Sequence, residues 1–377
     1  MPGWAYPGPE PDAFMGRDEV VEHLEAYATS FHAPVSEGVR VERVERRSSD
    51  DTFLLSTSSG VVQARRVVLA TGSLQRPNIP PWAAGVPNGV AQISATEYRI
   101  PSDLPPGAIV VVGSGESGCQ ISAELARSGR TVFLVGGRAW WAPRRYRGRD
   151  ISAWWRLTGW FERTVDDLPP GRRAGQPNAA LTGAEGGHDI SVHTLVRDGV
   201  RPTGRLVDIR DGTAVFADDL AANVAWGDGQ CRATLASVDR VIALQGISAP
   251  SPDAPDDLRH AGALPAATAR AIISAPATID LVREGVRTII WATGYRPDFS
   301  WVGLPFLAHD GYPIQRRGVT DIPGLYVLGL DWLHNAKSGL FAGLSDDATY
   351  LHEFITSRSG RPPTGERNSG DAPRDRL

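Results

Sequence analysis

Residues 113–118 carry the clearest chemical pattern in this chain. Their sequence, GSGESG, places Gly113, Gly115 and Gly118 in the spacing G-x-G-x-x-G. Glycines in this spacing allow a tight turn, let the backbone approach a phosphate and let a helix pack closely on a strand. A helix that begins at such a turn points unpaired N–H groups and the positive end of its dipole at an anion. The pattern predicts a pyrophosphate site, and its candidate residues are Gly113, Ser114, Gly115, Glu116, Ser117 and Gly118.

The residues on both sides of this segment supply the elements that such a site needs. AIVVV at 108–112 is a short apolar run, which is typical of a buried parallel strand. CQISAELARSG predicts a helix that ends at Gly129, and TVFLV at 131–135 predicts the next strand. A strand, a glycine turn, a helix and a strand in this order predict a dinucleotide-binding unit.

The end of the second strand indicates which dinucleotide is bound. Sites for NAD or FAD place an acidic residue there, where it binds the ribose 2′-hydroxyl. This chain has Gly136, Gly137 and Arg138 instead, so a cation is available for a 2′-phosphate. We therefore predict NADP(H), with a solvated surface role for Arg138 as the alternative.

Two similar segments indicate a second nucleotide-binding domain. RRVVLATG (65–72) and RTIIWATG (287–294) both end an apolar strand in Ala-Thr-Gly. Ligands of open α/β sheets bind at the carboxyl ends of strands, so Thr71, Gly72, Thr293 and Gly294 are candidate site residues. Either copy alone could be a turn, whereas two copies around a dinucleotide unit suggest crossovers between two domains.

Other segments complete the predicted organisation. We expect a helix at 18–31, a hairpin around 58–60, a Pro-rich connector at 73–107, a hairpin turn at Asp211-Gly212, a buried strand at 325–329 before Asp331, a helix at 341–355 and a disordered tail from 358.

Composition and charge exclude several classes of protein. The formal net charge of −4 argues against a nucleic-acid-binding protein. The Arg run at 144–149 is therefore assigned to cofactor or substrate-anion contacts, or to plain exposure. No apolar run approaches the roughly 20 residues of a membrane span, and the acidic first thirty residues do not form a signal peptide. We expect a cytoplasmic protein that does not bind membranes.

Cysteine and histidine patterns exclude further chemistry. The 2 cysteines, Cys119 and Cys231, form no C-x-x-C pair, which disfavours a disulfide reductase, the nearest alternative enzyme. The 8 histidines show no metal-binding spacing, and no nucleophile signature occurs, so we predict no metal site. The tryptophans at 140–160 are interpreted as packing.

Taken together, these segments resemble the flavin-containing monooxygenase-like group of flavoproteins. The matching stretches are PGWAYPGPEPDAFMGRDEVVEHLEAYA, VVLATGSLQRPNIP, VVVGSGESGCQISAELA, RRYRGRDISAWW, IIWATGYRPDFSW and GLYVLGLDWLHNAKSGLFAGLSDDATYL. The resemblance implies an α/β fold with two Rossmann-like domains. An FAD-type domain (1–105 and 286–357) would hold an inserted NADPH-binding domain (106–285), followed by the tail at 358–377.

The resemblance also implies cofactors and an activity. NADPH would reduce FAD, and the reduced flavin would use O₂ to oxygenate a small organic substrate. By position, residues 113–118 and Arg138 would hold NADPH. The residues near the flavin or the crossover would be Thr71, Gly72, Thr293, Gly294, Gly329 and Asp331. Neither the resemblance nor the residues name a catalytic side chain.

Two departures bear on FAD. The family has a first G-x-G-x-x-G unit for FAD, and this chain has none before residue 113, so we expect an FAD-type domain short by one βαβ unit of about 30 residues. Of the family pattern F-x-G-x-x-x-H-x-x-x-Y, Tyr98 alone is present. The alternatives are a non-catalytic NADP(H)-binding remnant or partner subunit that has lost FAD, and a fragment that folds poorly.

Overall fold

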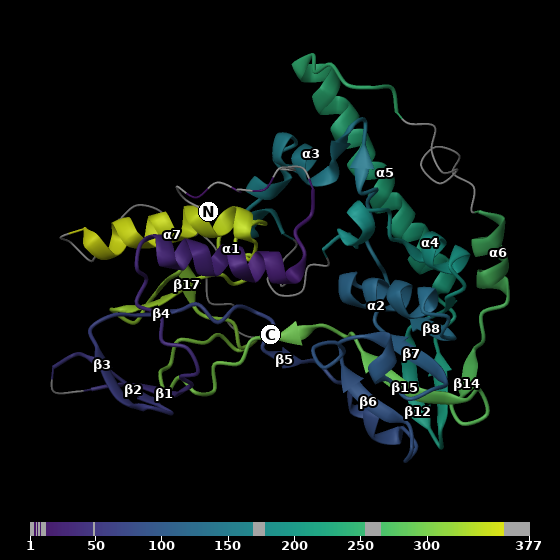
Figure 1. The fold of residues 1–377 in the computed structure, drawn as a ribbon, viewed down its shortest axis with the longest axis horizontal. Helices are drawn as coiled ribbons and strands as arrows, with labels where there is room; N and C mark the ends of the chain where they lie inside the picture. The colour runs from purple at the N-terminus through teal and green to yellow at the C-terminus, as the bar shows by residue number, and fades with distance from the viewer. Residues whose placement is uncertain are drawn as a thin grey trace, which may run out of the picture.

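The computed structural model describes residues 4, 6, 8, 13–47, 50–168, 178–252 and 265–357. The predicted tail at 358–377 lies outside these ranges. Within them, no helix is both long and apolar enough to cross a membrane. The fold is α/β, as predicted, and its elements form two groups around separate sheets (Figure 1).

The first group is built on a five-stranded parallel sheet of order β11-β8-β7-β15-β6. Its strands are β6 (Ala91–Ser94), β7 (Ala108–Val112), β8 (Val132–Val135), β11 (Arg201–Thr203) and β15 (Val286–Trp291). Every residue of β7 and β8 is buried, because the sheet is covered on both faces. The predicted strands and the helix between them are confirmed.

Different layers cover the two faces of this sheet. Ile109 and Val111 of β7 pack with Ile121 and Leu125 of α2 (Glu116–Arg127) on one face. On the other face, Val110 packs against an antiparallel sheet of β12 (Leu206–Arg210), β13 (Thr213–Phe216) and β14 (Thr278–Asp280). The predicted hairpin turn lies between β12 and β13, where Asp211 and Gly212 both have positive φ, 47° and 74°.

The parallel sheet extends beyond the predicted limits of the inserted domain. Both β6 and β15 lie outside residues 106–285, yet β15 pairs with β7 on one side and β6 on the other. The boundaries between the two domains therefore stay a prediction. The strands of the parallel sheet come from residues 91–291, a wider range than the predicted 106–285.

The second group contains the other Ala-Thr-Gly strand. β4 (Val67–Leu69) runs parallel to β19 (Leu325–Val327), which continues through β18 (Val319–Thr320) to β17 (Gln315–Arg316). The predicted hairpin forms between β2 (Phe53–Thr57) and β3 (Gly60–Ala64), with β1 (Val41–Arg46) beside β2. The run predicted as the second strand of this hairpin, residues 61–70, forms two strands. β3 ends at Ala64 in the sheet with β1 and β2, and β4 then joins the sheet with β19.

Helices and a shared core complete this second group. Phe53, Leu69, Phe306 and Val327 belong to one buried cluster that joins its sheets. The expected helices form as α1 (Arg17–Ser30) and α7 (Phe341–Thr356).

Two short strands connect the groups. β5 (Arg76–Pro77) follows β4, and β16 (Tyr295–Arg296) follows β15, and the two pair antiparallel. The two Ala-Thr-Gly segments thus lie at the start of adjacent crossovers, as the repeat suggested. The predicted connector at 73–107 contains β5, β6 and two 3₁₀ turns, η1 (Pro81–Gly85) and η2 (Pro101–Asp103).

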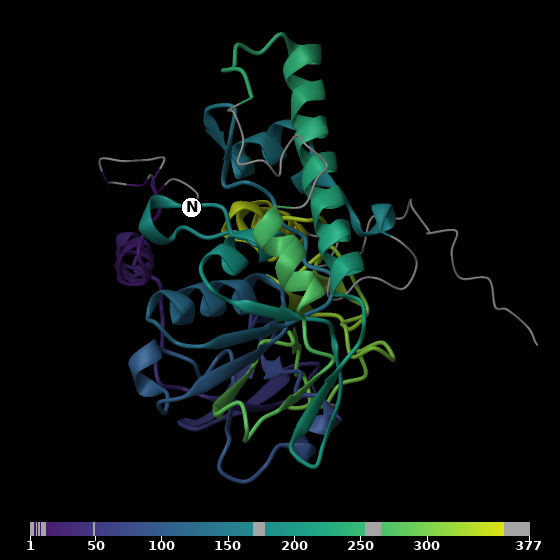
Figure 2. The same cartoon turned by 90° about the vertical axis from the view of Figure 1, so that its right-hand side faces the viewer.

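The Trp-rich segment packs against a long helix that the sequence analysis did not predict. This segment contains β9 (Arg145–Tyr146), β10 (Arg149–Asp150), α3 (Ile151–Leu157), η3 (Trp160–Glu162) and η4 (Val165–Asp167), and η5 (Ala184–Gly186) and α4 (Val192–Arg197) follow. The helix is α5 (Leu220–Gln245), which together with α6 (Ala266–Ile273) lies between β13 and β14 in sequence. Figures 1 and 2 show α5 projecting beyond the sheet, with α3 beside its upper half. Trp154 and Trp155 pack against Leu235 and Val238 of α5.

Candidate functional site

The glycines at 113–118 have distinct structural roles. Gly113 has φ of 117°, and a Cβ there would lie 2.1 Å from the Ala292 carbonyl oxygen. A Cβ at Gly118 would lie 1.8 Å from the Gly113 carbonyl oxygen, so glycine is required for the helix to pack on the turn. A Cβ at Gly115, by contrast, would meet no atom within 4 Å. Gly113 and Gly118 thus allow close packing of the backbone, whereas Gly115 borders open space.

This open space lies at the N-terminal end of α2. Gly115 is the N-cap of the helix, and no side chain caps its first turn. Ser117 lies in that turn, where free N–H groups and the helix dipole favour an anion. The arrangement matches what a pyrophosphate group requires.

Ser114 and Glu116 shape the same corner. The Ser114 hydroxyl is buried and donates to the Gly137 carbonyl oxygen at 3.0 Å. This bond ties the glycine fingerprint, residues 113–118, to the end of β8. Glu116 is half-buried at the start of α2. Burial raises the pKa of the Glu116 carboxyl, and the charge of Arg144 partly offsets that effect.

Arg138 lies where the sequence placed it, after β8. It is exposed, and its guanidinium carbon lies 5.9 Å from the ring centroid of Trp226 on α5. Its side chain therefore lies against α5, a helix that no local sequence pattern indicates.

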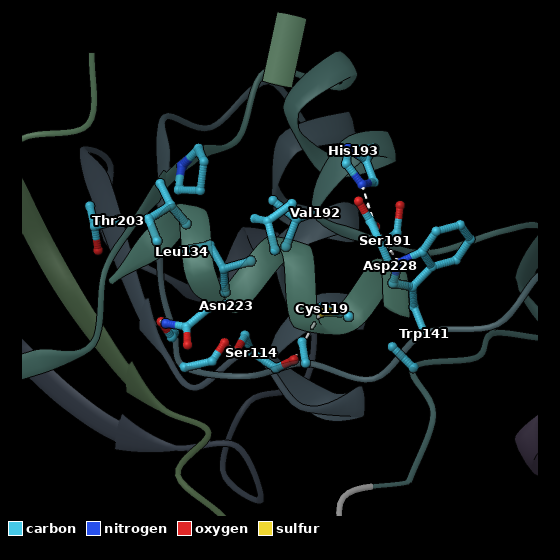
Figure 3. Close-up of a pocket in the computed structure, with 18 residues that line it drawn as sticks. Ser114, Cys119, Leu134, Trp141, Ser191, Val192, His193, Thr203, Asn223 and Asp228 are labelled. Carbon is cyan, nitrogen blue, oxygen red and sulfur yellow. Dashed lines mark hydrogen bonds and ion pairs between the residues drawn. The ribbon is translucent and has the colours of Figure 1, made fainter. Parts of the chain in front are cut away.

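A small cavity lies beside Ser114, at the ends of β8 and β11. It measures about 20 Å³, enough for about one water molecule. Its lining includes Ser114, Gly136 and Gly137 on the sheet side and Asn223 and Asp228 on α5. In Figure 3, Ser114 and Asn223 lie near one another, and a dashed line joins His193 to Asp228 on the other side of the pocket.

His193 and Asp228 belong to a buried polar network that sequence reasoning missed. The Asp228 carboxylate accepts from Trp141 Nε1 at 3.0 Å and contacts His193 Nε2 at 2.8 Å. His193 Nδ1 contacts the Thr268 hydroxyl of α6 at 2.9 Å. These residues lie far apart in the sequence and match no motif, so only the tertiary structure reveals them.

The crossover residues lie together on both sides of the paired strands β5 and β16. The Thr71 hydroxyl accepts from Gln75 Nε2 at 2.8 Å, and the Thr293 hydroxyl donates to the Asn78 carbonyl oxygen at 2.5 Å. Gly72 and Gly294 have φ of 69° and 84° and border open space. Both Ala-Thr-Gly segments therefore turn the chain out of its sheet at the same place.

Gly329 and Asp331 follow β19, whose neighbour is β4, the strand before Thr71. Gly329 has φ of 73°. The Asp331 backbone N–H donates to the Ser73 hydroxyl at 3.0 Å, so the two strand ends are directly joined. The structure thus brings Thr71, Gly72, Gly329 and Asp331 into one region. Within the described residues, no hydrogen bond or ion pair connects Arg138 to it.

The Arg run has partners within the chain. Arg144 pairs with Asp150 at 2.7 Å, Arg147 pairs with Asp239 at 2.7 Å, and Arg149 lies over the Trp154 ring. These contacts stabilise the Trp-rich segment, so a phosphate is not needed to explain the charges.

Cys119 and Cys231 are both buried, and they do not form a disulfide with each other. Burial, with a further contribution from Glu116, raises the pKa of Cys119 to about 12, so its thiol stays protonated at neutral pH. The described part of the chain also shows no group of three or more His, Cys, Asp or Glu side chains placed to hold a metal ion.

Known proteins share this fold and sequence pattern. Residues 8–165 match the family model described as pyridine nucleotide-disulphide oxidoreductase. An uncharacterized CzcO-like oxidoreductase from Geobacillus kaustophilus (strain HTA426) is 28% identical over 353 residues, which cover 93% of this chain and 81% of the relative.

Solved structures of flavin monooxygenases share the fold. A flavin monooxygenase variant from Stenotrophomonas maltophilia aligns with a TM-score of 0.56 at 18% identity, covering 94% of this chain and 81% of the other. The FAD-bound cadaverine monooxygenase DfoA from Erwinia amylovora aligns with a TM-score of 0.52 at 15% identity, covering 95% and 78%. In sequence the chain is thus similar to pyridine nucleotide-disulphide oxidoreductases and to an uncharacterized CzcO-like oxidoreductase, and in fold it is similar to flavin monooxygenases.

Proposed function

We propose that this protein is an NADPH-dependent flavoprotein oxidoreductase of the monooxygenase type. It would bind NADPH at residues 113–118 and Arg138, and FAD beside the crossover. Its substrate would be a small organic molecule that is oxygenated with O₂. The fold of flavin monooxygenases supports the reaction type, and the residues of the fingerprint support the nucleotide.

One observation carries the nucleotide assignment. Gly115 borders open space at an uncapped helix N-terminus, while Gly113 and Gly118 hold the turn that creates this space. A phosphate at this point would accept hydrogen bonds from N–H groups at the start of α2. The residues therefore fit a dinucleotide pyrophosphate.

The residues after β8 favour NADPH over NADH. Gly136, Gly137 and Arg138 offer no carboxylate to a ribose 2′-hydroxyl, and the Arg138 guanidinium is exposed and available to a 2′-phosphate. Ser114 would hold this loop in place through its bond to Gly137.

Residues on the other side of the crossover fit a flavin. Gly72 and Gly294 leave open space where the two crossovers begin, and Gly329 and Asp331 border the same region. These residues would hold a flavin there, and the flavin would supply redox chemistry between a nicotinamide and O₂. The chain's own residues would position the two rings and exclude water.

Gly115→Ala provides a sharp test of the nucleotide site. The backbone there has φ of −71°, which alanine adopts freely, and the new methyl group would occupy the proposed phosphate space. We expect unchanged thermal stability and NADPH affinity weaker by roughly tenfold or more. The matched control is Gly229→Ala on α5, whose Cβ would also meet open space. Equal NADPH affinity in wild type and Gly115→Ala would contradict the assignment.

A second candidate function follows from the sequence. A non-catalytic NADP(H)-binding protein or partner subunit without flavin is the competing proposal, because the fingerprint at residues 113–118 supports a nucleotide site by itself. The absorbance spectrum of the purified protein separates the two. Stoichiometric flavin with NADPH oxidation supports the monooxygenase type, whereas NADPH binding without flavin, even after FAD is added, supports the alternative.

A further inference from the structure

Arg205 lies beside the end of β8, although it follows the neighbouring strand β11. The two strands are parallel, and Thr203 pairs with Val135 at their carboxyl ends. Two residues beyond these positions the chain reaches Arg205 and Gly137. A Cβ at Gly137 would lie 3.2 Å from both Cγ and Cδ of Arg205. The absence of a side chain at Gly137 therefore lets Arg205 lie against the backbone that follows β8.

Asp219 holds the Arg205 side chain in this position. The Arg205 backbone N–H donates to Asp219 Oδ1 at 3.0 Å, and Arg205 Nε donates to Asp219 Oδ2 at 2.7 Å. Burial raises the pKa of the Asp219 carboxyl, but the bonds from Arg205 outweigh this effect and hold that pKa below its ordinary value. Asp219 is thus ionised at neutral pH, and both of its oxygens serve the arginine.

These bonds leave the outer half of the Arg205 guanidinium group free. Arg205 uses its Nε for Asp219, and no group in the described part of the chain bonds to its two Nη atoms. The side chain is 66% exposed. A guanidinium group binds phosphate through two parallel N–H donors, so the free Nη groups suit an anion that arrives from solvent.

Arg138 offers a second free guanidinium group at the same strand end. It directly follows Gly137, it is exposed, and its guanidinium carbon lies 5.9 Å from the ring centroid of Trp226. No hydrogen bond or ion pair with another described residue occupies it. In nucleotide-binding sheets, the residues after the second strand contact the 2′ position of the ribose. Two arginines, one from each of two adjacent strands, therefore adjoin the place where a 2′-phosphate is expected.

We propose that Arg205 is a second ligand of the nucleotide 2′-phosphate and shares with Arg138 the discrimination between NADPH and NADH. The inference rests on the proposed function, since it takes NADPH to bind at this strand end. NADH lacks the 2′-phosphate, so it gains nothing from Arg205. The pairing with Asp219 keeps the guanidinium group oriented before the nucleotide arrives, which lowers the entropy lost on binding.

Two arginines that follow or begin the same strand provide matched variants. Arg205→Gln removes the proposed ligand. Arg201→Gln removes the same charge from an exposed side chain at the opposite end of β11. Arg205→Lys keeps the charge and loses the planar fork. Because the Arg205 side chain is largely exposed, we expect all three variants to fold, and thermal unfolding checks this before binding is measured.

Titrations with NADPH and NADH test the proposal. We expect Arg205→Gln to weaken NADPH binding by about tenfold and to leave NADH binding unchanged, because a charge-assisted bond to the 2′-phosphate is lost. Arg205→Lys is expected to keep part of the preference for NADPH, and Arg201→Gln to keep all of it. Calorimetry with adenosine 2′,5′-bisphosphate and 5′-AMP repeats the comparison without a nicotinamide, a flavin or turnover, and the same loss is expected for the bisphosphate alone.

The outcomes separate this inference from the proposed function. An unchanged ratio of NADPH to NADH affinity in Arg205→Gln would overturn Arg205 as a ligand, and so would an equal loss of both nucleotides. Equal ratios in Arg205→Gln and Arg205→Lys would do the same, because the charge would then have no role. Each of these results leaves the nucleotide site itself in place. Failure of the wild-type protein to bind NADPH would overturn the proposed function, and the inference with it.

Discussion

Glu116 places a half-buried carboxyl group at the helix end that we assign to the pyrophosphate. Burial raises the pKa of this carboxyl in the free protein. A bound pyrophosphate would raise it further, because two negative charges would then share the site. If the nucleotide binds as proposed, Glu116 would therefore take up protons on binding.

The difference between the pKa of Glu116 in the free protein and its pKa in the complex determines how NADPH affinity changes with pH. We expect NADPH affinity to be highest below the pKa of Glu116 in the free protein, where the carboxyl is already neutral. It falls as the pH rises through the interval up to the pKa in the complex, and then levels off. We expect Glu116→Gln to bind NADPH more tightly than wild type at pH 8 and to remove this dependence. Titrations between pH 5 and 8 check this, and parallel curves for the two proteins would contradict it.

At the scale of single elements, α3 is held by its first residues. The Asp150 carboxylate is the N-cap and accepts from the Ser152 backbone N–H at 2.8 Å. It also pairs with Arg144 at 2.7 Å. One side chain thus caps the helix that carries Trp154 and Trp155 and ties it to Arg144, the residue before β9.

Two substitutions separate these roles. Asp150→Ala removes both and is expected to lower the free energy of unfolding by about 1–2 kcal/mol. Asp150→Asn keeps a capping oxygen and loses the charge, so it should cost less than Asp150→Ala. Urea unfolding followed by tryptophan fluorescence measures both values. Equal losses would mean that the cap contributes nothing beyond the ion pair.

Local sequence signals predicted much of the fold. The continuous apolar runs of β7 and β8 and the glycine spacing between them predicted strands, turn and helix, because each signal is short-range. Asp211-Gly212 predicted its hairpin because few other residues adopt positive φ at both positions.

Helix α5 escaped prediction for physical reasons. Its buried face includes Asn223, Gly227 and Asp228, which are poor helix formers and do not read as an apolar stripe. No side chain caps its start. Asn223 and Gly227 approach the backbone of residues 136–139, and Asp228 bonds to Trp141 and His193, so the residues that obscure the helix pattern are those that its packing requires. The membership of β15 in the parallel sheet likewise depends on pairing with β7, which no local pattern shows.

At the scale of the whole molecule, residues 160–163 of the Trp-rich segment contact residues 332–337 of the second group of elements. The Ala336 backbone N–H donates to the Arg163 carbonyl oxygen at 2.9 Å, and the rings of Trp160 and Trp332 lie 6.4 Å apart. Lys337 completes the contact with bonds to Asp346 at 2.8 Å and Glu162 at 2.7 Å.

Lys337 is 15% exposed in its side chain, and its bonds to Asp346 and then Glu162 raise its pKa. Its contribution to stability is therefore fully present below the ordinary lysine pKa of 10.5 and is lost as the pH rises through the higher folded value. We expect Lys337→Met to lower the free energy of unfolding by about 1–2 kcal/mol at pH 7, because two carboxylates lose their shared cation. The difference should narrow above pH 10.5, and Lys337→Arg should retain most of the stability. Chemical unfolding across this pH range checks the sign, and a loss that is constant with pH would contradict it.

Lys337 is also the only lysine in the sequence. Because this amine is largely buried and bonded on both sides, an acylating reagent would modify it slowly while the two groups of elements stay in contact. Any separation of the groups would free the amine and speed its acylation. Mass spectrometry of that single side chain would thus time the separation in the unlabelled native protein, with no engineered reporter.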